Sequence, residues 1–209
     1  MLVADEELMA QCRQGDMSAF ELIVRRYQDR IVNYITRVIN DHHRAEDLAQ
    51  EAFLRVLGSI QRYRPKGQFK NWLYLIATNL CRNELRNRNR QSTDLFSQLG
   101  LESSDSPGDQ QSPILEDLLS DSRYLPDQLY EQKEREQAIR QQVDLLPENQ
   151  RLSLVLVTYQ ELSYQEVSQI IGCSVSAVKP LIHRARQKLK QKLIEIGIEE
   201  SSNAKIQVR

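Results

Sequence analysis

The sequence predicts an all-α protein made of two small helical domains joined by an acidic flexible linker. Glycine and proline are scarce, at seven and six of 209 residues. No stretch shows the alternation of β-branched residues that is typical of strands, whereas apolar residues recur with helical spacing on both sides of a polar segment. We expect a first domain over residues 1–91, a linker over 92–124, a second domain over 125–196 and a tail over 197–209.

Four helices are predicted in the first domain. A short helix covers Glu6–Arg13 and stops at Gly15, and Asp16 then caps a long helix that ends near Ile39. The third helix runs over Arg44–Leu57 and the fourth over Phe69–Asn89. Each of the three longer helices carries an apolar stripe, which predicts that they share one core.

A polar segment separates this domain from the second. Ser, Asp and Gln dominate residues 91–124, and apolar residues thin out to scattered leucines. Such a segment buries too little apolar surface to offset its ordering entropy, so a solvated linker is expected. The second domain begins around 125–132 with a helix that ends at Leu145-Leu146. The chain restarts at Pro147, a residue suited to the first helical position.

The last third of the chain has the order of a helix-turn-helix unit. Ser163 and Glu166 have capping-box spacing at the start of a short helix, and Gly172 stands where a left-handed residue ends it. Ser174 or Ser176 can then cap a longer helix with one apolar seam and a cationic outer face. These parts, in this order, indicate a DNA reader, although a surface helix with a solvated charged face is the plainer alternative.

Charge is strongly segregated although the net charge is only −1. Residues 60–90 hold eight Lys or Arg and one acid, Glu84, and residues 174–193 hold six Lys or Arg and no acid. An acidic block lies between them. This pattern indicates contact with a polyanion at two places, while the acidic block either occupies a cationic channel or shields the basic blocks.

The first domain combines an acidic helix face with a basic, aromatic stretch. Asp47, Gln50 and Glu51 share one polar face, for which a solvated surface is the plain alternative. The loop over 62–68 is cationic, and it leads into a helix where Trp72 and other aromatics alternate with Arg and Lys. Aromatics interleaved with cations suit single-stranded DNA, because bases stack on rings while cations follow the backbone. Trp72 alone would more often be a core residue.

Two long stretches resemble a known family. The stretch SAFELIVRRYQDRIVNYITRVI, followed by AEDLAQEAFLRVLGSIQRYRPKGQFKNWLYLIATNLCRNELRNR, resembles region 2 of bacterial sigma factors of the extracytoplasmic-function group. The stretch Leu146–Leu193 resembles their region 4. The resemblance covers roughly two thirds of the chain in the right order. It implies a promoter-specificity subunit of RNA polymerase that responds to a stress or signal and lacks the extra domains of housekeeping sigma factors.

The resemblance also implies roles for individual residues. It assigns docking on the β′ clamp helices of core RNA polymerase to Asp47, Gln50 and Glu51. It assigns the melting and reading of the −10 element to Tyr63, Arg64, Lys66, Phe69, Trp72, Asn79, Arg82, Arg86 and Arg88, the three arginines following the DNA backbone. It assigns −35 recognition to Ser176, Lys179, His183, Arg184 and Arg186.

The implied partners are core polymerase, through the β′ clamp helices and the β flap, promoter DNA in double-stranded and melted form, and an anti-sigma factor. One departure from the family pattern concerns −35 reading: Pro180-Leu181 stands where many relatives have Ser-Arg. A proline removes one backbone hydrogen bond and crowds the carbonyl four residues earlier. The chain also lacks an arginine there that could contact a base or phosphate.

Two alternatives remain open: a stand-alone helix-turn-helix regulator, and a sigma-like decoy that sequesters an anti-sigma factor. No Ser/His/Asp set, carboxylate pair or Gly-rich phosphate loop indicates an enzyme. The three cysteines are widely spaced and form no metal-binding pattern with histidine, so no cofactor is expected. No apolar run approaches the length of a membrane span, and a cytoplasmic protein without membrane contact is expected.

Overall fold

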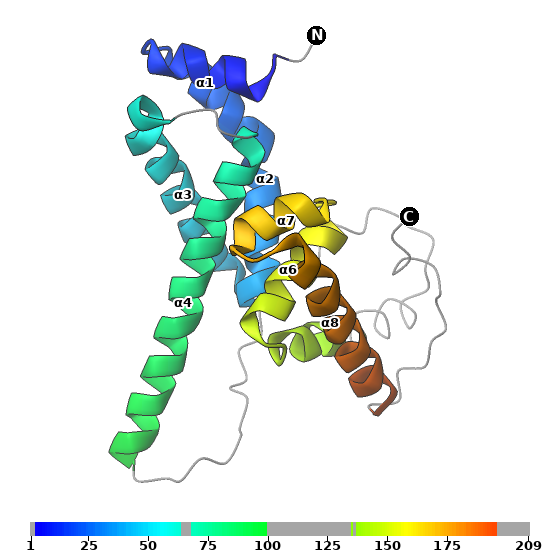
Figure 1. Cartoon of the computed structure of the whole chain (residues 1–209). Helices are drawn as coiled ribbons and strands as arrows, with labels where there is room; N and C mark the ends of the chain where they lie inside the picture. The colour runs from blue at the N-terminus through cyan, green and yellow to red at the C-terminus, as the bar shows by residue number, and fades with distance from the viewer. Residues whose placement is uncertain (1–2, 64–67, 100–134, 136, 196–209) are drawn as a thin grey trace, which may run out of the picture.

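The computed structural model describes residues 3–63, 68–99, 135 and 137–195, and over these residues it contains helices and no strand (Figure 1). The helices are α1 (Asp5–Arg13), α2 (Met17–Ile39), α3 (His42–Ser59), the 3-10 turn η1 (Ile60–Arg62), α4 (Phe69–Leu99), α6 (Glu148–Tyr159), α7 (Tyr164–Ile171) and α8 (Val175–Glu195). A further helical stretch covers 137–144. The all-α prediction is confirmed. Most of the expected linker and the tail lie outside the described residues.

The first bundle is built around α2, which packs against α1, α3 and α4. Its start and end follow from local chemistry. The Asp16 carboxylate accepts hydrogen bonds from the backbone N–H of Ser18 and Ala19, at 2.9 and 3.4 Å. Asn40 ends the helix in the left-handed conformation at φ 53°. The apolar stripe of α2 is buried, as the spacing predicted.

Helices α3 and α4 are longer than predicted. Helix α3 begins at His42, because Asp41 caps it by accepting from the backbone N–H of Arg44 at 2.9 Å. Helix α4 continues to Leu99, ten residues past the predicted end. The polar composition after residue 90 predicts the end of the helix, but no Gly or Pro interrupts residues 69–99, so the backbone hydrogen bonds of the helix continue.

The second bundle contains α6, α7 and α8, each in contact with the other two. The predicted capping box is present: the Ser163 hydroxyl accepts from the backbone N–H of Glu166, and the Glu166 carboxylate accepts from the Ser163 backbone N–H at 2.7 Å. Gly172 ends α7 at φ +79°, a conformation that costs glycine little. Pro147 is the N-cap of α6, and the first helical residue is Glu148. The prediction had placed Pro147 itself at the first helical position.

The two bundles pack against each other, which the sequence did not predict. Helix α6 lies against α2, and α7 lies against α4. Figure 1 shows α3 on the opposite side of α4 from α6, α7 and α8, and the far end of α8 pointing away from α4. Helices α2 and α4 therefore pack against each other in the first bundle and also form the surface on which the second bundle packs.

An ion network fastens α4 to the start of α3. The Glu84 carboxylate accepts from Arg44 and Arg88, at 3.0 Å each. Arg88 also reaches the Asp41 carboxylate at 2.9 Å and the Ile39 carbonyl at 3.0 Å. Burial raises the pKa of Glu84, but the hydrogen bonds and charges of the two arginines outweigh it and hold this pKa below its ordinary value.

The network gives the first bundle an acid-sensitive component of stability. A carboxylate with a depressed pKa stabilises the fold above its unfolded pKa of about 4.3, and this contribution is lost as pH falls through the folded pKa. We expect Glu84→Gln to lower the free energy of unfolding by about 1–3 kcal/mol at pH 7, with the deficit shrinking below pH ~4. Urea titrations from pH 7 to pH 3 measure this, with the exposed Glu21→Gln as control. A deficit independent of pH would contradict it.

Candidate functional site

One face of α3 presents an acidic surface to solvent. Asp47 and Gln50 are exposed and Glu51 is half-exposed, while Leu48 and Phe53 face the core. Among the residues that the structure describes, both carboxylates pair with arginines of the same helix: Asp47 is 3.6 Å from Arg44, and Glu51 is 2.5 Å from Arg55. Solvent-exposed ion pairs of this kind contribute little to the stability of the fold. The two carboxylates can therefore exchange these pairs for contacts with a partner protein at little loss of stability.

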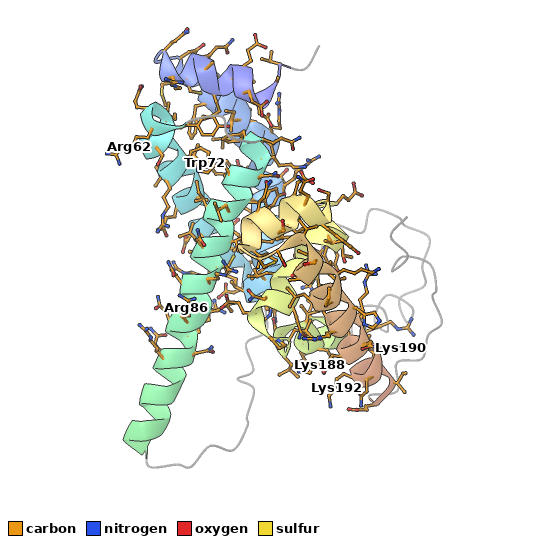
Figure 2. The ribbon with its side chains drawn as sticks, viewed as in Figure 1. Arg62, Trp72, Arg86, Lys188, Lys190 and Lys192 are labelled. Atoms are coloured by element: carbon orange, nitrogen blue, oxygen red, sulfur yellow. The ribbon has the colours of Figure 1, made fainter. Side chains whose placement is uncertain are left out.

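Aromatic rings cluster where η1 meets α4. Trp72 lies 4.7 Å from Tyr63 and 6.0 Å from Phe69, measured between ring centroids. Phe69 is fully buried and Tyr63 is 8% exposed, so in this conformation Trp72, half-buried, is the ring of the three nearest to solvent. Figure 2 shows Trp72 between Arg62 of η1 and the first turns of α4. Phe69 and Tyr63 thus act as a support for Trp72.

Helix α1 holds this cluster in place, a role that the sequence did not reveal. The Glu6 carboxylate accepts from the Phe69 backbone N–H at 3.3 Å, at the first turn of α4. Asp5 accepts from the Tyr27 hydroxyl and from Arg26. Tyr27 in turn lies edge-on to Phe69, 5.7 Å between ring centroids. The contact of Glu6 with Phe69 joins residues 63 positions apart in the chain, so no local pattern in the sequence points to it.

The cations of α4 differ in their surroundings. Asn79 and Arg86 are exposed, and Figure 2 shows Arg86 well below Trp72 on α4. Arg88 is engaged with Glu84, Asp41 and the Ile39 carbonyl. Arg82 points instead to the second bundle. Arg64 and Lys66 lie outside the described residues.

A polar cleft opens between α4 and α6. It is lined by Asn79, Arg82, Asn83, Arg86, Glu148 and Asn149. The expected DNA-facing residues of α4 therefore border the second bundle directly, and Glu148 on the α6 side of the cleft pairs with Arg82 at 2.9 Å.

Helix α8 carries the second cationic surface. Val178, Ile182 and Ala185 are buried against α6 and α7. The outer side exposes Ser176, Lys179, His183 and Arg184, and Arg186 is half-buried. Figure 2 shows Lys188, Lys190 and Lys192 on the part of α8 that leads away from α4. The structure thus brings the predicted −35 residues together on one helix with an apolar inner seam.

Comparison with known proteins identifies the family. The model of Sigma-70 region 2 matches residues 23–91, and the model of Sigma-70 region 4 matches residues 136–189. The RNA polymerase sigma-H factor of Pseudomonas aeruginosa is 31% identical over 189 residues, which span 90% of this chain and 93% of that protein. The ECF RNA polymerase sigma factor SigW of Bacillus subtilis is 33% identical over 186 residues, 89% of this chain and 95% of that protein.

The chain is a sigma factor of the sigma-70 family. Its similarity to SigW and to the ECF sigma-E factor of Escherichia coli, 29% identical over 193 residues, places it in the extracytoplasmic-function group. A sigma factor directs RNA polymerase in transcription initiation and is not an enzyme. Both family matches fall in the order that the resemblance implied, region 2 before region 4.

Solved structures support the fold of this sigma factor. The structure of CnrH in complex with the cytosolic domain of CnrY has a TM-score of 0.64 at 21% identity, covering 92% of this chain and 99% of that one. The sigma factor RpoE in complex with the anti-sigma factor NepR from Bartonella quintana has a TM-score of 0.59 at 20% identity, covering 84% and 96%. At these identities the similarity concerns the fold alone.

Two kinds of feature are missing from the described part of the sigma factor. Its helices include none with the length and apolar character that crossing a bilayer requires. Its described His, Cys, Asp and Glu side chains form no group of three suited to a metal ion.

The proline of α8 offers a direct test of the recognition helix. Pro180 is the sixth residue of α8 and is exposed, so the carbonyl of Ser176 receives no hydrogen bond from position 180. We expect Pro180→Ser to restore that bond and raise the free energy of unfolding of the sigma factor by about 1–2 kcal/mol, a gain below the full cost of an interior proline. Thermal unfolding followed by circular dichroism measures it. Destabilisation would mean that this turn of α8 is shaped around the proline.

Proposed function

We propose that the acidic face of α3 docks the sigma factor on the β′ clamp helices of core RNA polymerase, and that the β flap holds region 4. The observation that carries the proposal is that Asp47 and Gln50 are exposed and Glu51 is half-exposed on a helix that lies on the opposite side of α4 from the second bundle (Figure 1). Complementary charge at such a face accelerates and orients association. The protein would act in the cytoplasm, where the polymerase is.

The −10 element is proposed to bind at the aromatic and cationic side of α4. Trp72 offers a ring on which an unstacked base can lie, and Phe69 and Tyr63 hold that ring from the core. Asn79, Arg82 and Arg86 would follow the backbone of the melted strand, with Arg64 and Lys66 contributing from the preceding loop. Arg88 is paired with Asp41 and Glu84. It would contribute to the positive potential around the DNA rather than contact the DNA directly.

The −35 element is proposed to bind the outer face of α8. Lys179 and Arg184 would contact phosphates, and Ser176 and His183 would approach base edges in the major groove. Arg186 is half-buried. Its side chain would pack against the helix bundle and its charge would add to the positive potential near the DNA. Pro180 and Leu181 lack the side-chain hydrogen-bond donors that Ser and Arg have at these positions in many relatives. The promoter preference of this sigma factor should therefore differ from that of those relatives.

An anti-sigma factor is a proposed further partner. The sigma factor RpoE of Bartonella quintana was solved with such a protein, NepR. A sigma factor of this group that met no inhibitor would compete for core polymerase continuously. The partner would have to cover the α3 face or one of the two cationic surfaces.

Run-off transcription tests the proposed function as a whole. Purified core polymerase is incubated with fragmented genomic DNA of the source organism, with and without the protein, and transcript starts are mapped. A set of starts that depends on the protein and shares −10 and −35 sequences is the expected result. DNA binding without such starts would indicate a stand-alone regulator. Capture of an anti-sigma factor with neither activity would indicate a decoy.

Charge reversal on α3 tests the docking face. We expect Asp47→Lys with Glu51→Lys to weaken binding to core polymerase by about 100-fold or more, because two interfacial charges are inverted. Surface plasmon resonance with immobilised core enzyme gives the affinity. The double variant Glu21→Lys with Asp29→Lys makes the same charge change on exposed positions of α2 and should bind normally. Unchanged affinity of a well-folded α3 variant would refute the assignment.

Substitution of Trp72 tests the melting role and separates it from packing. Trp72→Leu keeps apolar volume beside Tyr63 but removes the stacking surface, whereas Trp72→Ala removes both. We expect both variants to lose about 5–100-fold in open-complex formation, because stacking is worth ~1–3 kcal/mol per base. Only Trp72→Ala should also melt at a distinctly lower temperature. Permanganate footprinting on duplex and pre-melted promoters provides the readout, and wild-type melting by Trp72→Leu would make Trp72 a packing residue.

A further inference from the structure

The residue before α4 is not of a type that usually caps a helix. The first amides of an α-helix have no partner inside the helix, and Ser, Thr, Asp or Asn at the preceding position commonly supplies one. Gln68 stands at that position, and its carbonyl accepts from the backbone N–H of Asn71 at 3.0 Å and of Trp72 at 3.4 Å. Phe69 is fully buried, so its own backbone N–H needs an acceptor within the protein.

A carboxylate from another helix supplies this acceptor. Glu6, in the first turn of α1, accepts from the Phe69 N–H at 3.3 Å. The dipole of α4 also favours a negative charge at this end of the helix. Glu6 therefore does for α4 what an N-cap side chain does in other helices, although it belongs to a different helix.

The start of α1 is tied to α2, which fixes the place of Glu6. Its neighbour Asp5 accepts from the Tyr27 hydroxyl and from Arg26. Arg26 also donates to the Val3 carbonyl at 2.9 Å. Burial, together with the hydrogen bond to Asp5, raises the pKa of Tyr27 well above its ordinary value, so the hydroxyl keeps its proton and remains a donor.

The other end of α1 is tied to η1. The Gln61 side chain donates to the Arg13 carbonyl at 3.1 Å. Tyr63 directly follows η1, whereas Phe69 and Trp72 lie in the first turn of α4. Figure 2 shows Trp72 at the end of α4 that lies nearest α1. Helix α1 therefore contacts both of the elements that carry the three rings, one near each of its own ends.

We infer that Glu6 is a positioning residue for reading the −10 element: its hydrogen bond to the Phe69 amide sets where α4 begins, and so where the Trp72 ring meets a base. The inference rests on the proposed role of Trp72 in binding melted DNA. Trp72 follows Phe69 by about one helical turn, so fraying of that turn moves the ring directly. A ring that is held in place before binding loses less conformational freedom when a base stacks on it.

The neighbouring acid Glu7 offers a matched control. Glu6 and Glu7 are both exposed and both lie in the first turn of α1, so their substitutions change the charge and the dipole interactions of α1 alike. A helix turns by about 100° per residue, so the Glu7 side chain leaves α1 in a different direction. Glu6→Gln keeps a side-chain oxygen that can accept from the Phe69 amide, whereas Glu6→Ala removes the acceptor.

Tryptophan fluorescence follows the position of the ring without any DNA. The chain contains a single tryptophan, so emission and its quenching by acrylamide report on Trp72 alone. We expect Glu6→Ala to increase quenching and to shift the emission to longer wavelength, because the ring becomes more accessible to water. Glu6→Gln and Glu7→Ala should give the wild-type values. Equal quenching in Glu6→Ala and Glu7→Ala would overturn the inference.

Binding of a −10 oligonucleotide tests the consequence for DNA reading. The probe is a single-stranded oligonucleotide with the −10 sequence found by run-off transcription, and the protein is the holoenzyme formed with core polymerase. We expect Glu6→Ala to bind it about tenfold more weakly, because a buried amide is left without an acceptor. Glu6→Gln should recover most of this loss. The affinity of each variant for core polymerase should stay unchanged, which excludes general unfolding as the cause.

A double-mutant cycle shows whether Glu6 acts through the Trp72 ring. In a Trp72→Leu background, Glu6→Ala should weaken oligonucleotide binding by less than about twofold, because the ring that Glu6 positions is absent. The full loss in that background would overturn the inference, since Glu6 would then act elsewhere. Normal oligonucleotide binding by Trp72→Leu alone would instead overturn the proposed role of Trp72, and with it the DNA-reading part of the inference, whatever the quenching shows.

Discussion

Helix α4 is the element on which the rest of the structure depends, because it takes part in three different sets of contacts. Its inner side completes the core of the first bundle with Phe69, Leu73 and Ala77. Its start carries Trp72 against the aromatic support. Its remaining side offers Arg82 and Tyr74 to region 4. A helix rotates its side chains by a fixed angle per residue, so none of these surfaces can change without the others.

The arginines of α4 illustrate how one residue type takes different roles on a single helix. Arg88 closes a network inside the first bundle, Arg82 crosses to the second, and Arg86 stays exposed. The difference is one of acceptors within reach, not of intrinsic chemistry. Because guanidinium groups remain charged under all physiological conditions, each must be paired or solvated, and the pairing decides which of them is available to DNA.

Periodicity and local chemistry in the sequence determined most of the helices. The caps at Asp16 and Ser163 and the glycine at 172 depend only on residues within a few positions, so their structures follow from spacing. The exposed face of α3 and the two faces of α8 follow from the 3.6-residue repeat for the same reason. Where the local signal was absent, at the end of α4, the prediction was ten residues short.

The sequence alone thus determined an all-α chain with a helix-turn-helix, a segregated charge pattern and the residues of a sigma factor in order. Only the tertiary structure decided which residues around α4 are buried and which partners they have. It buried Phe69 and most of Tyr63 beneath Trp72, brought Glu6 to the start of α4, and turned Arg82 toward Glu148. The contacts of Glu6 with Phe69 and of Arg82 with Glu148 join residues 63 and 66 positions apart in the chain. Packing of whole helices sets such pairs, and no local pattern encodes them.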